Sequence, residues 1–171
     1  LIFDEIPTGL GKTGRFFAAE HDGAVPDIVV LGKALGGGVL PIAACLARDD
    51  LNVAGAYAFG HYTHEKNPVT ASAALATLEV IEREGLVENA ARVGVHALER
   101  LQEMLGIELV TDRAAKTPAV DLAEQVLYRA LSRGLSFKTT MGNTLTLTPP
   151  LITTPAQMDV ALDILDACLV G

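Results

Sequence analysis

The chain has little of several residue types, and each shortage argues against a class of protein. It contains no tryptophan, only 5% of its residues are aromatic, and two cysteines occur among its 171 residues. Cys45 and Cys168 are far apart in the sequence and lie in apolar stretches, which fits buried free thiols better than a disulfide framework. Free thiols are typical of a reducing compartment, so we expect a cytoplasmic protein.

Basic residues and long apolar runs are scarce as well. Lysine and arginine number 13 against 21 acidic residues, the formal net charge is −8, and the acidic excess is spread along the chain. This balance argues against a nucleic-acid partner. No apolar run approaches the roughly 18 residues of a membrane-spanning helix, so we expect no membrane partner either. The chain enters an apolar strand at Leu1 without a methionine or polar lead-in, and we therefore expect a piece of a longer protein.

Apolar residues are plentiful and follow the periods of helices and strands. Half of the residues are hydrophobic and the mean hydropathy is +0.34, enough for a sizeable core. The pattern predicts strands at 1–3, 28–31, 41–47, 107–110 and 144–148, and helices at 16–21, 71–81, 86–104, 120–132 and 154–169. Thr154-Pro155 is a helix start, with the threonine as N-cap and the proline in the first helical position. This order predicts an α/β fold for the first part and a smaller α+β unit for the last.

A run of branched apolar residues that ends at a lysine is the central feature of the sequence. Ile28–Leu31 is typical of a strand buried on both faces, and Gly32 then places Lys33 just past its end. Open α/β sheets bind ligands at such strand ends. A desolvated lysine there loses proton affinity and can form a Schiff base with a carbonyl compound such as pyridoxal phosphate. A solvated surface lysine at a turn explains the same residues.

A second strand end carries two carboxylates. Leu1-Ile2-Phe3 is followed by Asp4 and Glu5, and then by a loop rich in glycine. Asp4 by itself is equally well explained as a turn or helix cap. The Gly11-Lys12-Thr13 sequence in this loop does not make a phosphate-binding P-loop, because that motif needs a glycine where the chain has Ile6.

The polar segment around residues 60–68 is the third candidate region. Thr63 by itself fits an ordinary turn, and His61 and His64 are a metal-ligand pair that lacks a third ligand. Polar loops of this kind often contact ligands or partners. A serine hydrolase is not indicated, because none of the three serines lies in a Gly-x-Ser-x-Gly motif.

The order and spacing of these features resemble the class III aminotransferases, which are fold type I enzymes dependent on pyridoxal phosphate. The resemblance runs over the whole chain and covers what corresponds to the C-terminal half of the family's chain. It rests on Asp4-Glu5-Ile6-Pro7-Thr8-Gly9-Leu10-Gly11-Lys12-Thr13-Gly14, Leu31-Gly32-Lys33-Ala34-Leu35-Gly36-Gly37-Gly38, Thr63 before Asn67-Pro68, and Thr148-Pro149-Pro150-Leu151.

The resemblance implies a role for each candidate residue. Lys33 would hold pyridoxal phosphate as an internal aldimine, be displaced by the incoming amine, and then act as general base and acid. Asp4 would pair with the pyridinium nitrogen and keep it protonated, so that the ring can accept electrons from the substrate Cα. Thr63 would bind the cofactor phosphate of the neighbouring subunit, which implies a homodimer or a dimer of dimers. The glycines after Lys33 would let the backbone pass close to the cofactor.

The chain departs from the family pattern at three places. Pro7 stands where many members have a glutamine near the cofactor's phenolic oxygen, and proline cannot donate a hydrogen bond. Thr146 stands where many members have an arginine that grips a substrate α-carboxylate, and a hydroxyl cannot make that bidentate pair. An amine or other non-standard substrate then becomes plausible. The Met104-Leu105 junction is also shorter than the loop and strand usual in the family.

From these features we predict a partial fold type I α/β enzyme with pyridoxal phosphate as cofactor. Residues 1–85 would be the C-terminal part of the cofactor-binding large domain, 86–105 a bridging helix, and 106–171 a small α+β C-terminal domain. The reaction would move an amino group from an amine or amino acid to a 2-oxo acid. Two alternatives remain open, a lyase or decarboxylase on the same cofactor and a fragment that is not catalytic.

Overall fold

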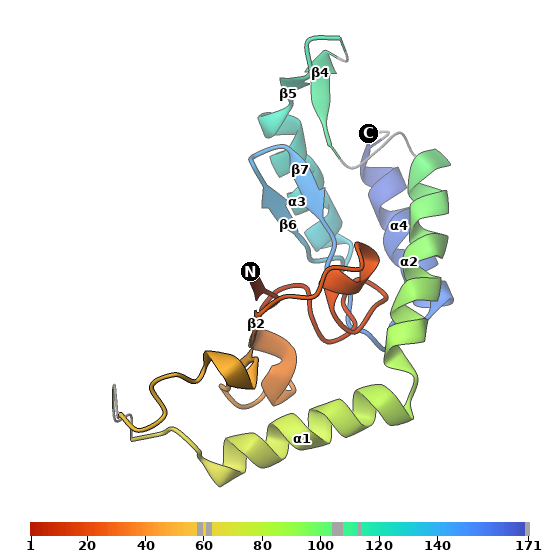
Figure 1. Cartoon of the computed structure of the whole chain (residues 1–171). Coiled ribbons are helices and arrows are strands. Elements are labelled where there is room, and N and C mark those ends of the chain that lie inside the picture. The colour runs from red at the N-terminus through yellow and green to blue at the C-terminus, as the bar shows by residue number, and fades with distance from the viewer. Residues whose placement is uncertain (58–59, 61–62, 104–107, 113, 170–171) are drawn as a thin grey trace. The chain divides into compact units, whose positions relative to one another are not determined.

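The computed structural model describes residues 1–57, 60, 63–103, 108–112 and 114–169 of the chain. These residues form two compact units, Leu1–Ala91 and Arg92–Gly171. Both units mix helices with short strands, as the ribbon in Figure 1 shows. No helix among the described residues is long and apolar enough to cross a membrane.

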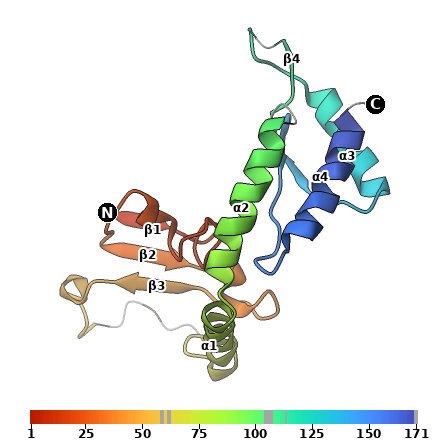
Figure 2. The same ribbon diagram turned by 90° about the vertical axis from the view of Figure 1, so that its right-hand side faces the viewer.

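The first unit is built on a three-stranded sheet. Its strands are β1 (Ile2–Asp4), β2 (Ile28–Leu31) and β3 (Ala44–Ala47), in the order β1-β2-β3. β1 pairs with β2 in parallel, with Asp4 opposite Val30, and β2 pairs with β3 in antiparallel fashion. Figure 2 shows the three strands side by side. Because β1 and β2 run in parallel, their carboxyl ends lie at the same edge of the sheet.

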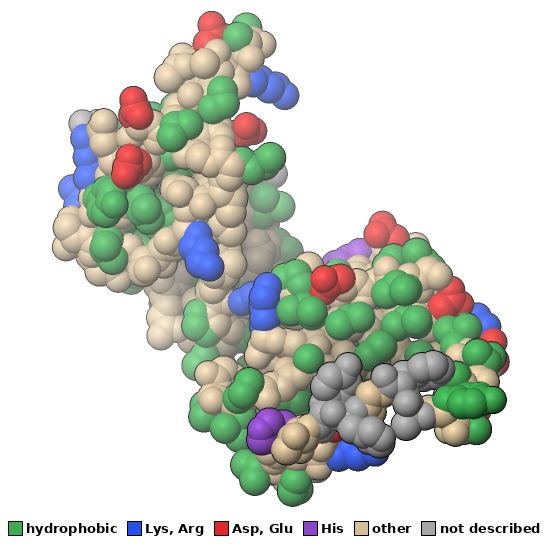
Figure 3. All heavy atoms as spheres, turned by 90° about the vertical axis from the view of Figure 1, so that its left-hand side faces the viewer, with side chains coloured by type: hydrophobic (Ala, Val, Ile, Leu, Met, Phe, Trp, Pro, Cys, Tyr) green, Lys and Arg blue, Asp and Glu red, His purple; other side chains and the backbone are tan. Residues whose placement is uncertain are grey.

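The sheet is less covered than the sequence predicts. We expected Ile28–Leu31 to be buried on both faces, but only Leu31 is buried and the other three residues keep part of their surface exposed. Ile2 on β1 is 64% exposed and Leu46 on β3 is 50% exposed. Hydrophobic side chains are visible on the surface in the space-filling view of Figure 3. Within the described residues, β1 and β3 are the outer strands of the sheet, and each has one side whose backbone is not paired with another strand. Such unpaired sides can pair with further strands.

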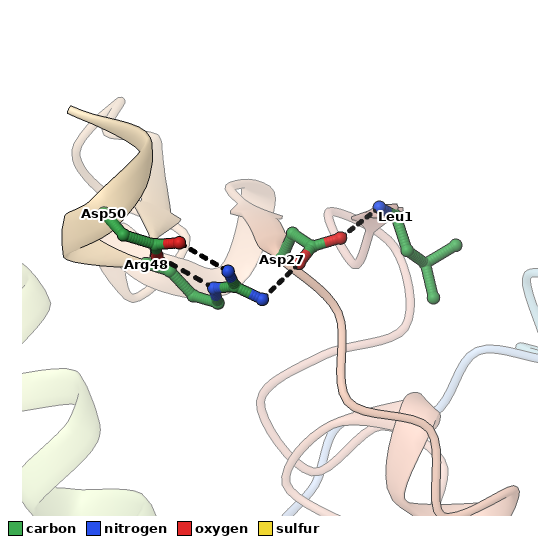
Figure 4. Close-up of polar contacts among 4 residues, drawn as sticks. All are labelled: Leu1, Asp27, Arg48 and Asp50. Carbon is green, nitrogen blue, oxygen red and sulfur yellow. Dashed lines mark hydrogen bonds and ion pairs between the residues drawn. The ribbon is translucent and has the colours of Figure 1, made fainter. Parts of the chain in front are cut away.

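A group of charges closes the opposite end of the β2–β3 pair. Arg48, just after β3, donates to Asp27 at 2.8 Å and makes two bonds to Asp50, at 2.9 and 2.5 Å. Asp27 also binds the amino group of Leu1, as Figure 4 shows. These groups are solvent-exposed, so water and salt screen each ion pair and its contribution to stability is small. The cluster joins the start of β2 to the end of β3, at the end of the strand pair away from Lys33.

Helical segments complete the first unit. They are the single turns η1 (Ala18–His21), η2 (Lys33–Gly36) and η3 (Asp49–Leu51), the helix α1 (Pro68–Arg83), and the start of α2 (Leu86–Glu103). Asn67 caps α1, because its side chain accepts the N–H of Val69 at 2.9 Å. α1 packs against η2, the turn that begins at Lys33.

The second unit packs three helices and two hairpins around one core. The hairpins are β4 (Val110–Asp112) with β5 (Thr117–Pro118) and β6 (Lys138–Thr140) with β7 (Thr144–Thr146), and the helices are α3 (Val120–Ser132), α4 (Pro155–Leu169) and the larger part of α2. Val126 of α3 and Leu162 of α4 are fully buried at the centre, with Val93 of α2 in the same cluster. An ion-pair group also joins α2 to α4, because Asp159 accepts from His96 at 2.7 Å and from Arg100 at 3.0 Å.

Helices match the sequence patterns more closely than strands do. α3 and α4 lie where the patterns predict them, and the residues that the structure describes in α2 match as well. β3 and β7 are shorter than the predicted strands 41–47 and 144–148. The strand predicted at 107–110 is displaced, since β4 begins at Val110 and Glu108 makes only an isolated bridge with Thr144. The sequence patterns did not predict β5 or β6. The Met104-Leu105 junction lies outside the described residues.

Candidate active site

Lys33 lies at the carboxyl end of β2, as the sequence predicts. Gly32 separates it from the last strand residue, and Lys33 is the first residue of η2, with an exposed side chain. Its φ angle is 46°, in the left-handed region that non-glycine residues rarely adopt. Such a conformation costs about 1–3 kcal/mol and occurs often at functional sites. In the described part of the chain no hydrogen bond or ion pair holds the Lys33 amine.

Asp4 lies at the same edge of the sheet as Lys33. It is the last residue of β1, and β1 ends beside the end of β2 because the two strands are parallel and Asp4 is opposite Val30. The Asp4 side chain is exposed, and its Oδ1 atom accepts the backbone N–H of Ile6 at 3.0 Å. That bond orients the carboxylate and leaves Oδ2 available to a ligand.

Glu5 does not share the exposed edge with Asp4. It is 3% exposed, and its carboxylate accepts the Thr8 hydroxyl at 2.6 Å and the Ala19 N–H at 2.9 Å. Burial raises the pKa of Glu5, but the hydrogen bonds from Thr8 and from the backbone of Ala19 and Ala18 outweigh it and bring the pKa below the ordinary value. The sequence placed two carboxylates at the strand end, whereas the structure leaves one of them at the surface.

A second lysine of the first unit has a perturbed amine. Desolvation lowers the pKa of Lys12, in the loop after β1, below its ordinary value. A lowered amine pKa is the property that favours Schiff-base formation, so Lys12 is a chemical competitor of Lys33. This could not be predicted from the sequence, because desolvation of an amine depends on which groups surround it in the folded protein.

The region around Thr63 is a polar, exposed segment. Thr63 and His64 lie in a turn, and no hydrogen bond that the structure describes joins Thr63 to Asp4 or Lys33. His61 lies outside the described residues. Among the residues that are described, no three His, Cys, Asp or Glu side chains are placed to hold a metal ion. The structure thus brings Asp4 and Lys33 to one edge of the sheet, whereas Thr63 lies outside the sheet, in the turn before α1.

Thr146 belongs to the second unit and lies in β7. Its hydroxyl shares a hydrogen bond of 2.8 Å with the hydroxyl of Thr140 on β6. Lys138 is its direct partner across the hairpin. Thr146 itself brings no charge to this face of the hairpin, and its hydroxyl already makes one hydrogen bond to another hydroxyl.

The chemistry at the β1–β2 edge fits pyridoxal phosphate. A carboxylate oxygen at one strand end can hold the proton of a pyridinium nitrogen, and an amine at the neighbouring strand end can bond to an aldehyde carbon. The glycines after Lys33 differ in the room they leave: a Cβ on Gly38 would meet no atom within 4 Å, whereas one on Gly37 would lie 3.0 Å from the Thr77 hydroxyl oxygen. Pro7 is exposed in the loop after β1 and has neither an N–H nor a polar side chain to offer.

Comparison with known proteins places these residues in a family. The family model described as aminotransferase class-III matches residues 1–169. An acetylornithine aminotransferase from Archaeoglobus fulgidus is 41% identical over 96% of the chain and 44% of its own length.

Not every relative is an aminotransferase by name. An (R)-1-hydroxy-2-aminoethylphosphonate ammonia-lyase from Vibrio splendidus is 42% identical over 99% of the chain and 39% of its own length. A leucine/methionine racemase from Thermococcus litoralis is 38% identical over 99% of the chain and 42% of its own length. The chain therefore spans less than half the length of these curated relatives.

Solved structures give the same family and fold. A transaminase with L-alanine superposes with a TM-score of 0.93 at 32% identity, over 99% of this chain and 46% of that one. A PLP-bound amine transaminase from an uncultivated Pseudomonas species superposes with a TM-score of 0.92 at 28% identity, over 99% of this chain and 44% of that one. The predicted α/β fold of fold type I is confirmed, and the chain belongs to the class III aminotransferase family.

Proposed function

We propose that the protein containing this chain is a pyridoxal phosphate-dependent aminotransferase that moves an amino group from an amine or amino acid to a 2-oxo acid. The observation that carries the proposal is the placement of Asp4 and Lys33 at the ends of two parallel, hydrogen-bonded strands. Membership of the class III aminotransferases supports it.

Each candidate residue has one task in this proposal. Bound pyridoxal phosphate supplies an electron sink for a bond broken at the substrate Cα. Lys33 anchors the cofactor through its amine and then moves a proton at the substrate Cα. Asp4, oriented by the Ile6 N–H, holds the proton on the ring nitrogen through its free oxygen.

The test is an amino-transfer assay on the natural full-length protein. With pyridoxal phosphate, a panel of amino donors and a 2-oxo acid, Lys33→Ala is expected to lower kcat by roughly 10²-fold to 10⁴-fold or more, because the proton-transfer group is removed. Lys116→Ala is the matched control, because Lys116 is also exposed and also has a positive φ angle, but lies on the β4–β5 hairpin. Full activity in Lys33→Ala would contradict the proposal.

In this proposal the protein is a homodimer, and Thr63 binds the cofactor phosphate of the neighbouring subunit. Neither Lys33→Ala nor Thr63→Ala homodimers would then have a complete site, but a mixed dimer would have one, with Lys33 and Thr63 from different subunits. We expect mixing the two inactive variants to restore activity. No recovery from verified mixed dimers would show that Thr63 serves its own subunit or none.

A lyase on the same cofactor is the second candidate. It is favoured by the absence of a charged side chain at Thr146, whose hydroxyl is paired with Thr140, and by the 42% identity to an ammonia-lyase from Vibrio splendidus. A lyase would release ammonia from an amine without any 2-oxo acid acceptor. Measuring ammonia and the aminated acceptor in the same reaction separates the two activities.

We also propose the domain assignment and the compartment. Residues 1–85 would be part of the cofactor-binding large domain, 86–105 the bridging helix, and 106–171 the small domain. The division of the two compact units between Ala91 and Arg92, inside the assigned bridging helix, supports this assignment. A cytoplasmic location is supported by Cys45 and Cys168, which are both free, although Cys45 is exposed and not buried as the sequence predicted.

A further inference from the structure

Glu5 is a buried carboxylate with every polar group engaged, next to Asp4. Its side chain accepts from Thr8 at 2.6 Å and from the N–H of Ala19 in η1 at 2.9 Å. Its backbone N–H donates to the Val30 carbonyl of β2 at 2.9 Å, and its own carbonyl accepts from Gly9 at 2.9 Å. Glu5 therefore ties the end of β1 both to β2 and to the loop that follows.

Ile6, the next residue, contacts both sides of the candidate site. Its N–H donates to the Asp4 carboxylate at 3.0 Å. Its side chain lies over Gly32, because a Cβ built on Gly32 would be 3.5 Å from both Cγ1 and Cγ2 of Ile6. Gly32 directly precedes Lys33. A single residue thus orients the carboxylate and packs against the backbone that carries the amine.

We propose that Glu5 is a positioning residue for the cofactor site: its buried carboxylate fixes Ile6, and Ile6 sets the Asp4 carboxylate relative to the Gly32–Lys33 backbone. The inference rests on the proposed function, in which Asp4 and Lys33 hold pyridoxal phosphate. A binding site depends on supporting contacts that hold its ligand-contacting groups to a fraction of an ångström. The four hydrogen bonds of Glu5 provide such support from within the protein.

Two substitutions distinguish the effect of the Glu5 hydrogen bonds from the effect of its negative charge. Glu5→Gln keeps an oxygen for the Ala19 N–H and offers an amide that can donate to the Thr8 hydroxyl, so it preserves the anchoring contacts. Glu5→Leu has a similar size but no acceptor. We expect Glu5→Gln to bind pyridoxal phosphate nearly as the unsubstituted protein does. We expect Glu5→Leu to bind it about tenfold or more weakly, the scale of loss seen when a supporting partner of a ligand-binding group is removed.

The measurement is the Kd of pyridoxal phosphate in the natural full-length protein, from titration of the cofactor's visible absorption on samples shown to be folded by circular dichroism. Ile81→Ala is the matched control for lost stability, because Ile81 is buried in α1 of the same unit and is not one of the residues through which Glu5 is proposed to act. We expect this control to keep the Kd of the unsubstituted protein.

Three results would overturn the positioning role. The first is a Kd of pyridoxal phosphate in folded Glu5→Leu that equals the Kd of the unsubstituted protein. The second is an equal loss of cofactor affinity in Glu5→Leu and Ile81→Ala. The third is a Glu5→Gln protein that binds pyridoxal phosphate no more tightly than Glu5→Leu does. The proposed function fails on a different observation, namely the absence of any borohydride-reducible link between pyridoxal phosphate and Lys33 in the unsubstituted protein.

Discussion

At the scale of single residues, the adjacent carboxylates of Asp4 and Glu5 differ in exposure and in hydrogen bonding. Asp4 is exposed at the strand end with one oxygen bound by Ile6, whereas Glu5 is buried with both oxygens bound. A strand alternates its side chains between faces, so neighbouring positions cannot both point to the same ligand. The sequence predicts the acid pair but not this division, because the partner that buries Glu5 is the Ala19 N–H, 14 residues further along.

Gly9 and Gly32, both near the site, differ in the space available for a Cβ atom. A Cβ on Gly9 would lie 2.9 Å from the Leu31 side chain and 3.0 Å from the Glu5 carbonyl oxygen, which is backbone and cannot swing away. A Cβ on Gly32 would meet nothing closer than 3.5 Å. We expect Gly9→Ala to lower the free energy of unfolding by about 1–3 kcal/mol through overpacking. Gly32→Ala should change it by about 0.5 kcal/mol or less. Urea unfolding of both variants checks this, and equal costs would contradict it.

The hydrogen bonds to the Glu5 carboxylate make the free energy of unfolding depend on pH in the acidic range. Its pKa in the folded protein is below the ordinary value of 4.5, so its carboxylate stabilises the fold above that pH. The contribution is lost as the pH falls through the folded pKa. We expect the difference in unfolding free energy between the unsubstituted protein and Glu5→Gln to be larger at pH 6 than at pH 3.5. Glu79→Gln, on the exposed part of α1, controls for the loss of one charge. A difference that does not change with pH would contradict the expectation.

At the scale of elements, the long helices could be predicted from the sequence, but the shortest strands, β5 and β6, could not. α3 and α4 carry apolar residues at helical spacing over 13 and 15 residues, long enough for the pattern to be distinct. β5 has two residues and β6 has three, which is too short for alternation to show. β7 lies inside the strand predicted at 144–148, but its partner strand in the hairpin was not predicted. The hairpin is instead defined by its turn, where Met141 and Gly142 both have positive φ angles. The Gly-Asn pair at 142–143 is the signal that could have located it.

The start of α4 shows a sequence signal that the structure confirms. The Thr154 N–H donates to the Gln157 side chain at 2.9 Å, and the Gln157 N–H donates to the Thr154 hydroxyl at 3.3 Å. This reciprocal pair is a capping box, with Pro155 in the first helical position.

Removing the capping hydroxyl should weaken the second unit. We expect Thr154→Ala to lower the unfolding free energy by about 1 kcal/mol, whereas Thr154→Ser keeps the acceptor and should cost much less. Thermal or urea unfolding of the three proteins is the measurement. A Thr154→Ala protein as stable as the unsubstituted one would show that the cap contributes nothing.

At the scale of the whole molecule, the chain consists of two separately packed units with different chemistry. The first brings Asp4 and Lys33 to one edge of a sheet, and the second has a closed apolar core around Val126 and Leu162. The order of acid, lysine and threonine in the sequence predicted the family. Only the parallel pairing of β1 and β2, which depends on hydrogen bonds between distant segments, brings the first two together.

We propose that Lys33 carries the cofactor, and the competing lysine of the same unit is Lys12, whose amine pKa is lowered by desolvation. The direct measurement is borohydride reduction of the natural full-length protein with pyridoxal phosphate, followed by peptide mass spectrometry to locate the modified lysine. We expect one stoichiometric phosphopyridoxyl group on Lys33, and its loss in Lys33→Ala but not in Lys12→Ala. Modification of Lys12 with Lys33 left unmodified, or a reducible adduct that persists in Lys33→Ala, would contradict it.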